Sequence, residues 1–143
     1  MIKIGIDPDI KKSGFCILLN NEVKELSLLS FFDLTAHLLE LKEYYNDCKQ
    51  KYVVVIEKGE SNKALFNAKG GAGVANKIAM QTGKNFAVTE LLIELCEREN
   101  IYYKTYVPKS AKWSHDYTNK LVKNLPKQTN PDKRDAIRAA VMG

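Results

Sequence analysis

Apolar and polar residues alternate from the beginning of the chain, and this pattern predicts three consecutive strands. Ile2, Ile4 and Ile6 alternate with small or polar residues, which is the two-residue period of a strand. Further apolar runs at 14–19 and 23–29 are separated by an Asn-Asn pair suited to a turn. Because both connections are short, the three strands are expected to form an antiparallel meander.

A helical period follows the third strand. Ser30 can cap a helix, and Asp33 would then lie in the first turn, where negative charge suits the helix dipole. One apolar face of this helix is expected to pack on the core, through Leu34, Leu38, Leu41 and Tyr45.

The next strand is predicted at 52–56, because the nearly continuous run YVVVI is typical of a strand covered on both faces. The polar, glycine-rich segment 58–76 is expected to be a mobile loop that can run into a helix. A helix is predicted at about 84–99, and its buried face is expected to comprise Val88, Leu91, Leu92 and Leu95.

The C-terminal third is predicted to contain one strand and two helices. The strand is expected at 101–107, and Ser114 can cap a short basic helix that ends near residue 125. Asn130 and Pro131 are suited to the cap and first position of the last helix. A three-strand meander followed by αβαβα indicates an α/β fold, with a mixed sheet and helices on both faces. At 143 residues, the simplest organisation is one domain, 1–143.

Four carboxylates are candidates for a common site. Asp7 and Glu57 each end an apolar strand, and parallel neighbouring strands would place both at one edge of the sheet. Asp132 and Asp135 are three residues apart near the start of the last helix, so they share a face. Asp7 alone could be a turn residue, and Asp132 alone fits a contact with the helix dipole. Glu57 is different, because a carboxylate at the end of a buried strand needs a partner or a metal.

Together, the four acids predict a metal site. Convergent carboxylates repel one another unless a cation neutralises them, and hard oxygen ligands suit Mg²⁺ or Mn²⁺. Two such ions roughly 4 Å apart can activate a water and stabilise the leaving oxygen in phosphodiester hydrolysis. We therefore predict that Asp7, Glu57, Asp132 and Asp135 are catalytic and metal-binding.

Charge is concentrated in the segment 104–134, which carries eight basic residues and two acids although the whole chain has a net charge of only +5. This distribution fits a polyanionic partner, and it equally fits a lysine-rich solvated surface. Lys109 and Lys112 follow the fifth predicted strand and are the best candidates for phosphate contacts. Lys112 could also stabilise charge that develops at the scissile phosphate. Lys69, Lys77 and Lys120 are second choices.

The cysteines and the lone tryptophan are expected to be structural. Cys16, Cys48 and Cys96 are scattered and lack metal-ligand spacing, which favours reduced core thiols in a cytosol-like compartment. A compact, lysine-rich chain is compatible with a bacterial or phage source, so the expected location is the cytoplasm of the bacterium or of the phage host. Trp113 could stack on a base, but the core is the simpler place for it. No apolar run approaches the ~20 residues of a membrane span, so no membrane association is expected.

Three motifs resemble the RuvC-type Holliday-junction resolvases of the ribonuclease H-like superfamily. They are GIDPD in the first strand, VVVIE in the fourth, and PDKRDAIRAAV in the last helix. The segments FNAKGGAG and VPKSAKW extend the resemblance over essentially the whole chain. It implies a five-stranded sheet of order 3-2-1-4-5, two Mg²⁺ or Mn²⁺ ions per active site on the four acids, and a homodimer that cuts a four-way DNA junction.

Two positions depart from the family pattern. Asp9 stands where the family usually has glycine, so the turn after Asp7 must accept a side chain; Asp9 could be an outer ligand, although turn chemistry explains it more simply. Glu60 stands where some members carry an aromatic residue that stacks at the junction centre, which leaves Phe66 as a possible replacement.

The leading hypothesis is a metal-dependent endonuclease that resolves Holliday junctions. One alternative keeps the fold and the metals but takes RNA–DNA hybrid or flapped DNA as substrate. A second alternative, from another class, is a non-catalytic module that binds junctions through the basic segment. A nucleotide-dependent phosphotransferase with a similar starting hairpin would need a second domain, for which 143 residues are too few.

Overall fold

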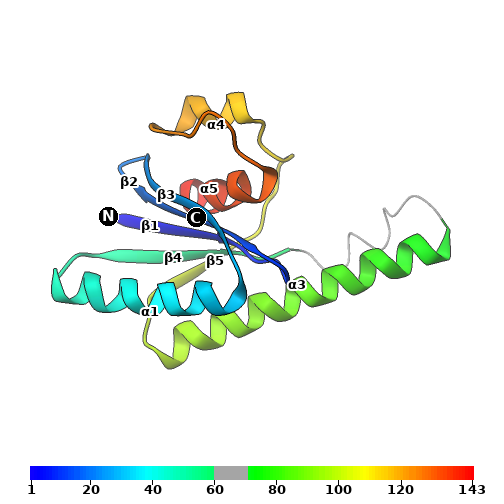
Figure 1. The fold of residues 1–143 in the computed structure, drawn as a ribbon, viewed down its shortest axis with the longest axis horizontal. Coiled ribbons are helices and arrows are strands. Elements are labelled where there is room, and N and C mark those ends of the chain that lie inside the picture. The colour runs from blue at the N-terminus through cyan, green and yellow to red at the C-terminus, as the bar shows by residue number, and fades with distance from the viewer. Residues whose placement is uncertain (60–70) are drawn as a thin grey trace.

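A computed structural model of the chain describes residues 1–59 and 71–143 and shows a mixed sheet with helices on both faces (Figure 1). Lys69, Phe66 and Glu60 lie outside the described residues. The strands are β1 (Ile2–Asp7), β2 (Ser13–Leu19), β3 (Glu22–Leu29), β4 (Tyr52–Glu57) and β5 (Tyr103–Tyr106). The helices are α1 (Phe31–Asp47), α3 (Ala72–Arg98), α4 (His115–Leu121) and α5 (Pro131–Met142).

The strand order is β3-β2-β1-β4-β5, as the sequence resemblance implied. The first three strands pair antiparallel, which confirms the predicted meander, whereas β4 is parallel to both β1 and β5. In the register of β1 and β4, Ile6 lies beside Ile56. The next residues are Asp7 and Glu57, so both carboxylates emerge at one edge of the sheet.

Each face of the sheet has its own apolar core. On one face, Ile4 and Ile6 of β1 pack with Leu34 of α1 and with Val88 and Leu92 of α3, and all five side chains are buried. This face is covered by α1 and α3, and α3 extends well beyond the sheet (Figure 1). The opposite face is covered by α5, with α4 farther out.

Small residues let α5 lie directly on the sheet. A Cβ atom at Gly5 would collide with the carbonyl oxygen of Ala136, and one at Gly14 would collide with that of Asp132. Cys16 donates a hydrogen bond from Sγ to the same Ala136 oxygen, 3.3 Å away. The backbone of α5 therefore touches the backbones of β1 and β2, without a layer of side chains between them.

The structure corrects the predicted helix at 84–99. The helix α3 begins twelve residues earlier, at Ala72, with Gly71 at its N-cap and no side-chain cap. In its first three turns Val74 and Met80 are exposed, and none of the side chains described there belongs to the buried cores. The predicted burial of Leu91 was also wrong: it is 49% exposed, since the core face runs through Val88, Leu92 and Cys96.

Other boundaries shift by a few residues. The strand β5 is limited to Tyr103–Tyr106 and α4 ends at Leu121, so both are shorter than predicted. Cys16 and Cys96 are buried as expected, but Cys48 is exposed at the C-terminal cap of α1. Trp113 is buried in the core beneath α5, as predicted. Among the described helices, none has the length and apolar character needed to cross a membrane.

The contact between α5 and β1 generates a stability prediction. Gly5→Ala should destabilise the fold by about 3 kcal/mol, because the added methyl group would push α5 away from the sheet. The free energy of unfolding, measured by urea denaturation, tests this.

Gly83→Ala is the matched control, because Gly83 lies within α3 and a Cβ there would meet no atom within 4 Å. It should stabilise the protein by about 0.5–1 kcal/mol, since alanine favours the helix and restricts the unfolded chain. Equal effects of the two substitutions would show that Gly5 is not needed for close packing.

Candidate metal-dependent active site

The sheet and α5 bring the four predicted acids to the same edge. Asp7 and Glu57 end the neighbouring strands β1 and β4. Asp7 also pairs with Gly14 of β2, and Gly14 packs against the backbone of Asp132. Because Asp132 begins α5, this contact places the N-terminal turn of the helix over the end of β1.

The N-terminus of α5 forms as the sequence predicts. The Asn130 side chain accepts a hydrogen bond from the Lys133 backbone at 2.9 Å, and Pro131 occupies the first turn. Asp132 is partly exposed, whereas Asp135 is buried one turn further along. The two acids thus differ in their access to solvent.

The surroundings of Asp7 disfavour the ionised form of its carboxyl group. Burial raises the pKa of Asp7 to about 8, with further increases from the nearby charges of Glu57, Asp135 and Asp132, and Lys112 acts in the opposite direction. Burial also raises the pKa of Glu57, although Arg138 partly counteracts it. The carboxyl groups are therefore close enough to disfavour full ionisation unless a cation is added.

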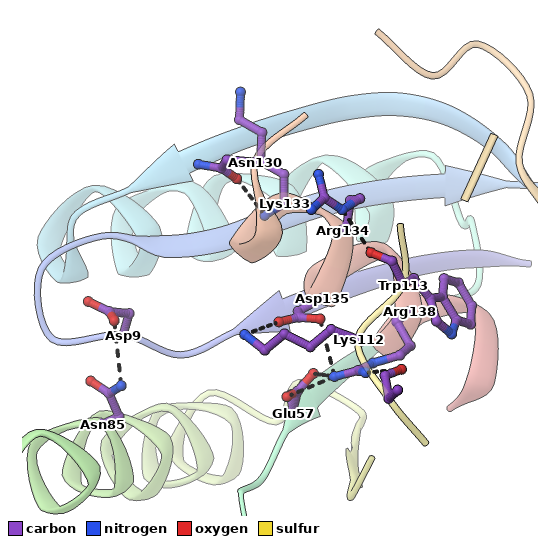
Figure 2. Close-up of polar contacts among 11 residues, drawn as sticks. Asp9, Glu57, Asn85, Lys112, Trp113, Asn130, Lys133, Arg134, Asp135 and Arg138 are labelled. Carbon is purple, nitrogen blue, oxygen red and sulfur yellow. Dashed lines mark hydrogen bonds and ion pairs between the residues drawn. The ribbon is translucent and has the colours of Figure 1, made fainter. Parts of the chain in front are cut away.

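Arg138 is the principal feature that the sequence analysis missed. Its guanidinium is 2% exposed and points from α5 toward the acids (Figure 2). The Nη2 atom lies 3.3 Å from Glu57 Oε2 and 3.2 Å from Asp135 Oδ1. Nη1 donates to the Ala111 carbonyl at 3.3 Å. A signal was available: Arg138 is three residues after Asp135 on the same helix face, within an otherwise apolar run.

Lys112 supplies a second positive charge. Its Nζ atom lies 3.1 Å from Asp135 Oδ2, but its side chain is 71% exposed. The segment that carries it is fixed to α5 on either side, because Arg138 binds the Ala111 carbonyl and Arg134 Nε donates to the Trp113 carbonyl at 2.9 Å. Lys112 is thus held at the site while its amino group remains accessible from solvent.

The turn after Asp7 shows how Asp9 is accommodated. Asp9 Oδ1 accepts a 2.7 Å hydrogen bond from the Lys11 backbone, which is ordinary turn chemistry. Asn85 of α3 accepts from the Ile10 backbone at 3.0 Å and donates to Asp9 Oδ2 at 3.5 Å (Figure 2). The Asp9 side chain therefore fastens the turn to α3.

A pocket of about 200 Å³ opens beside Asp7 and Glu57. Its far wall belongs to α3 and presents the polar side chains of Thr82, Asn85 and Thr89 next to the ring of Phe86. It has room for a group of small-ligand size next to the carboxylates.

The carboxylate oxygens of the four acids are suitable ligands for a hard cation, but in the part of the chain that the structure describes they are not already positioned around a common metal-binding point. Within 1–59 and 71–143, no group of three or more His, Cys, Asp or Glu residues is positioned to hold a metal ion. Glu57 and Asp135 are instead engaged with Arg138 and Lys112. One buried oxygen, Asp135 Oδ1, has the charge of Arg138 Nη2 3.2 Å away but makes no hydrogen bond of good geometry within the described part of the chain. The residues therefore fit a divalent cation next to Asp7, provided that some carboxylates reorient toward it.

The predicted DNA-binding lysines do not form one cluster. Lys109 is exposed in the segment after β5, close in sequence to Lys112. Lys77 is exposed on α3 and Lys120 on α4, and these helices lie on opposite sides of the sheet (Figure 1). Among the predicted lysines that the structure describes, only Lys112 therefore contacts the acids.

Comparison with known proteins identifies the fold. A structure of T. thermophilus RuvC in complex with a Holliday junction substrate is 12% identical, has a TM-score of 0.64, and matches over 99% of this chain and 91% of that one. A second Thermus thermophilus RuvC structure is 14% identical, with a TM-score of 0.57 and coverage of 99% and 92%. No protein-family model and no curated protein matches the chain. The fold is thus the ribonuclease H-like fold of RuvC.

The raised pKa of Asp7 predicts a pH-dependent stability in the absence of divalent metal. Between the ordinary value of 3.8 and about 8, the folded protein retains a proton on Asp7 that the unfolded chain has lost. Stability should therefore fall as pH rises through this window, by up to about 1.4 kcal/mol per unit, and level off above it. Asp7→Asn should remove most of this slope and be more stable than wild type near pH 8, as measured by urea denaturation in a chelator.

Asp47→Asn serves as the control, because Asp47 is exposed at the end of α1 and precedes the start of β4, whereas Glu57 ends that strand. It should retain the wild-type dependence on pH. A wild-type protein whose stability rises between about pH 5 and pH 8 would contradict the prediction.

Proposed function

We propose that this protein is a divalent-metal-dependent endonuclease that cuts branched DNA, with the four-way junction as its substrate. The observation that carries the proposal is the convergence of Asp7, Glu57, Asp132 and Asp135 at one sheet edge, on the fold of RuvC. The RuvC structure with a Holliday junction supports the choice of substrate.

The four acids would hold Mg²⁺ or Mn²⁺, and the bound cation would supply the positive charge that phosphodiester hydrolysis requires. Asp7 is the central candidate ligand, because burial and the three neighbouring acids together disfavour the ionised form of its carboxyl group, which a bound cation would stabilise. Glu57 and Asp135 are oriented by Arg138. The accessible amino group of Lys112 can exchange its ion pair with Asp135 for one with a phosphate that enters the site.

Lysines outside the carboxylate site would position the DNA. Lys109 would contact the phosphates that flank the cut; in support, it is exposed and follows β5 a few residues before Lys112. Lys77 on α3 and Lys120 on α4 would contact more distant arms, because they lie on opposite sides of the sheet. Lys69 and Phe66 remain sequence predictions for the same role. A homodimer would place two active sites on one junction.

A second candidate is a junction-binding module without catalytic activity. The ion pairs from Arg138 and Lys112 to Glu57 and Asp135 favour it, because they neutralise part of the acid cluster without any metal. A cleavage experiment separates the two functions, and including flapped DNA and RNA–DNA hybrid beside the junction tests the alternative substrates.

Asp7→Asn should abolish metal-dependent cleavage of a labelled four-way junction, with a loss of at least about 100-fold, because it removes the central charge of the site. Binding of the junction should be kept or improved, since repulsion between Asp7 and the phosphates falls. Gel assays of cleavage and of binding measure the two effects separately.

Asp47→Asn again provides the control and should cut like wild type. Equal cleavage by Asp7→Asn and wild type would disprove the metal-site assignment. Binding without cleavage in the wild type, with every divalent cation and substrate tested, would identify the non-catalytic module.

Lys109→Ala should weaken junction binding and reduce the slope of log affinity against log salt by about 1, because one phosphate contact is lost. Lys51→Ala is the matched control: it is exposed directly before β4, at the end of the strand opposite Glu57. Identical salt slopes for the two variants would remove Lys109 from the DNA interface.

A further inference from the structure

We infer that Arg138 takes the place of one of the two cations expected at this site, so that the site binds a single divalent cation per chain. The inference rests on the proposed function and concerns how that site balances its charge. It replaces the two-ion arrangement that the sequence resemblance implied.

The position of Arg138 is the first support. Its guanidinium is buried between the end of β4 and the second turn of α5, within 3.4 Å of both Glu57 oxygens and 3.2 Å from Asp135 Oδ1 (Figure 2). A cation that bridged Glu57 and Asp135 would have to occupy this same space. Arginine is permanently charged, so the position always carries a positive charge.

The charge balance is the second support. Four ionised carboxylates carry four negative charges, and Arg138 and Lys112 contribute two positive charges in direct contact with them. Two negative charges remain, which one divalent cation neutralises. A second divalent ion would make the cluster positive and would lie against the guanidinium, at a large electrostatic cost in a buried site.

Arg138 is also unable to leave easily. Its side chain is 2% exposed, its Nη1 atom is bound to the Ala111 carbonyl, and its helix is packed directly on β1 through Gly5. Lys112 differs, because its exposed side chain can swing into solvent. Arg138 is therefore a fixed part of the site, whereas Lys112 is exchangeable.

The remaining oxygens indicate where the single ion binds. Within the described part of the chain, neither Asp7 nor Asp132 takes part in an ion pair, whereas Glu57 and Asp135 each do. The pocket beside Asp7 gives access to that side of the cluster. The single cation should therefore depend most strongly on Asp7.

The test counts Mn²⁺ ions by calorimetry and by electron paramagnetic resonance of the full-length protein. Wild type should bind one Mn²⁺ per chain, with an uncoupled spectrum. Arg138→Met should bind two, with the spin coupling of a close pair, because the fixed charge is gone. Arg138→Lys should still bind one. The dependence of junction cleavage on Mg²⁺ concentration should have a Hill slope near 1 in wild type. This kinetic measurement also counts an ion that binds only together with the DNA.

Two bound ions in wild type, or a Hill slope near 2, would overturn the inference while leaving the proposed nuclease function intact. One ion in a folded Arg138→Met protein would overturn it as well. If Arg138→Met does not fold, the ion counts of wild type and of Lys112→Ala test the inference instead. Lys112→Ala should bind one ion, several-fold more tightly than wild type does. Two ions bound to Lys112→Ala would overturn the inference. Failure of wild type both to bind Mn²⁺ and to cleave would overturn the proposed function, and the inference with it.

Discussion

The direct contact between α5 and the sheet is the constraint on which the rest of the structure depends. Gly5 and Gly14 leave no room for side chains, so the helix backbone rests on the strand backbones. This contact fixes the height of α5 above β1 and β2, and it determines how far Asp132, Asp135 and Arg138 lie from Asp7 and Glu57. Strands and helix each supply only part of the site, and the two glycines set the distance between the parts.

Charge is the second determinant of the site. A buried set of carboxylates is unfavourable by itself, and the chain responds in two ways: a fixed guanidinium from α5 and an exposed amino group from the segment after β5. The first holds Glu57 and Asp135 in place, and the second remains free to exchange partners. Asp7 forms an ion pair with neither, and burial together with the neighbouring acids raises its pKa. Positive charge is therefore distributed unevenly over the four acids, because Glu57 and Asp135 have cationic partners and Asp7, at the end of β1, has none in direct contact among the residues that the structure describes.

Much of this could be predicted from the sequence, because the relevant signals are local. Strand alternation, the cap residues Ser30 and Asn130, and the acids at the strand ends each depend on near neighbours in the chain. The early start of α3 could not be predicted, because the sequence there is glycine-rich and the helix begins after Gly71 without a side-chain cap. The role of Arg138 is only partly encoded locally. Its position three residues after Asp135, within an apolar run, indicates a shared helix face, whereas its burial depends on the spacing between helix and sheet.

The link between Asn85 and the β1–β2 turn has a consequence for how this chain can vary. Asn85 uses both ends of its amide there, accepting from Ile10 and donating to Asp9. An aspartate at position 85 would set two carboxylates against each other, and an apolar residue would leave the Ile10 amide without its partner. A glycine at position 9 would in turn leave the Asn85 amide nitrogen without this acceptor. Positions 9 and 85, although 76 residues apart, therefore form a coupled pair, and substitutions at the two are expected to be tolerated together more readily than separately.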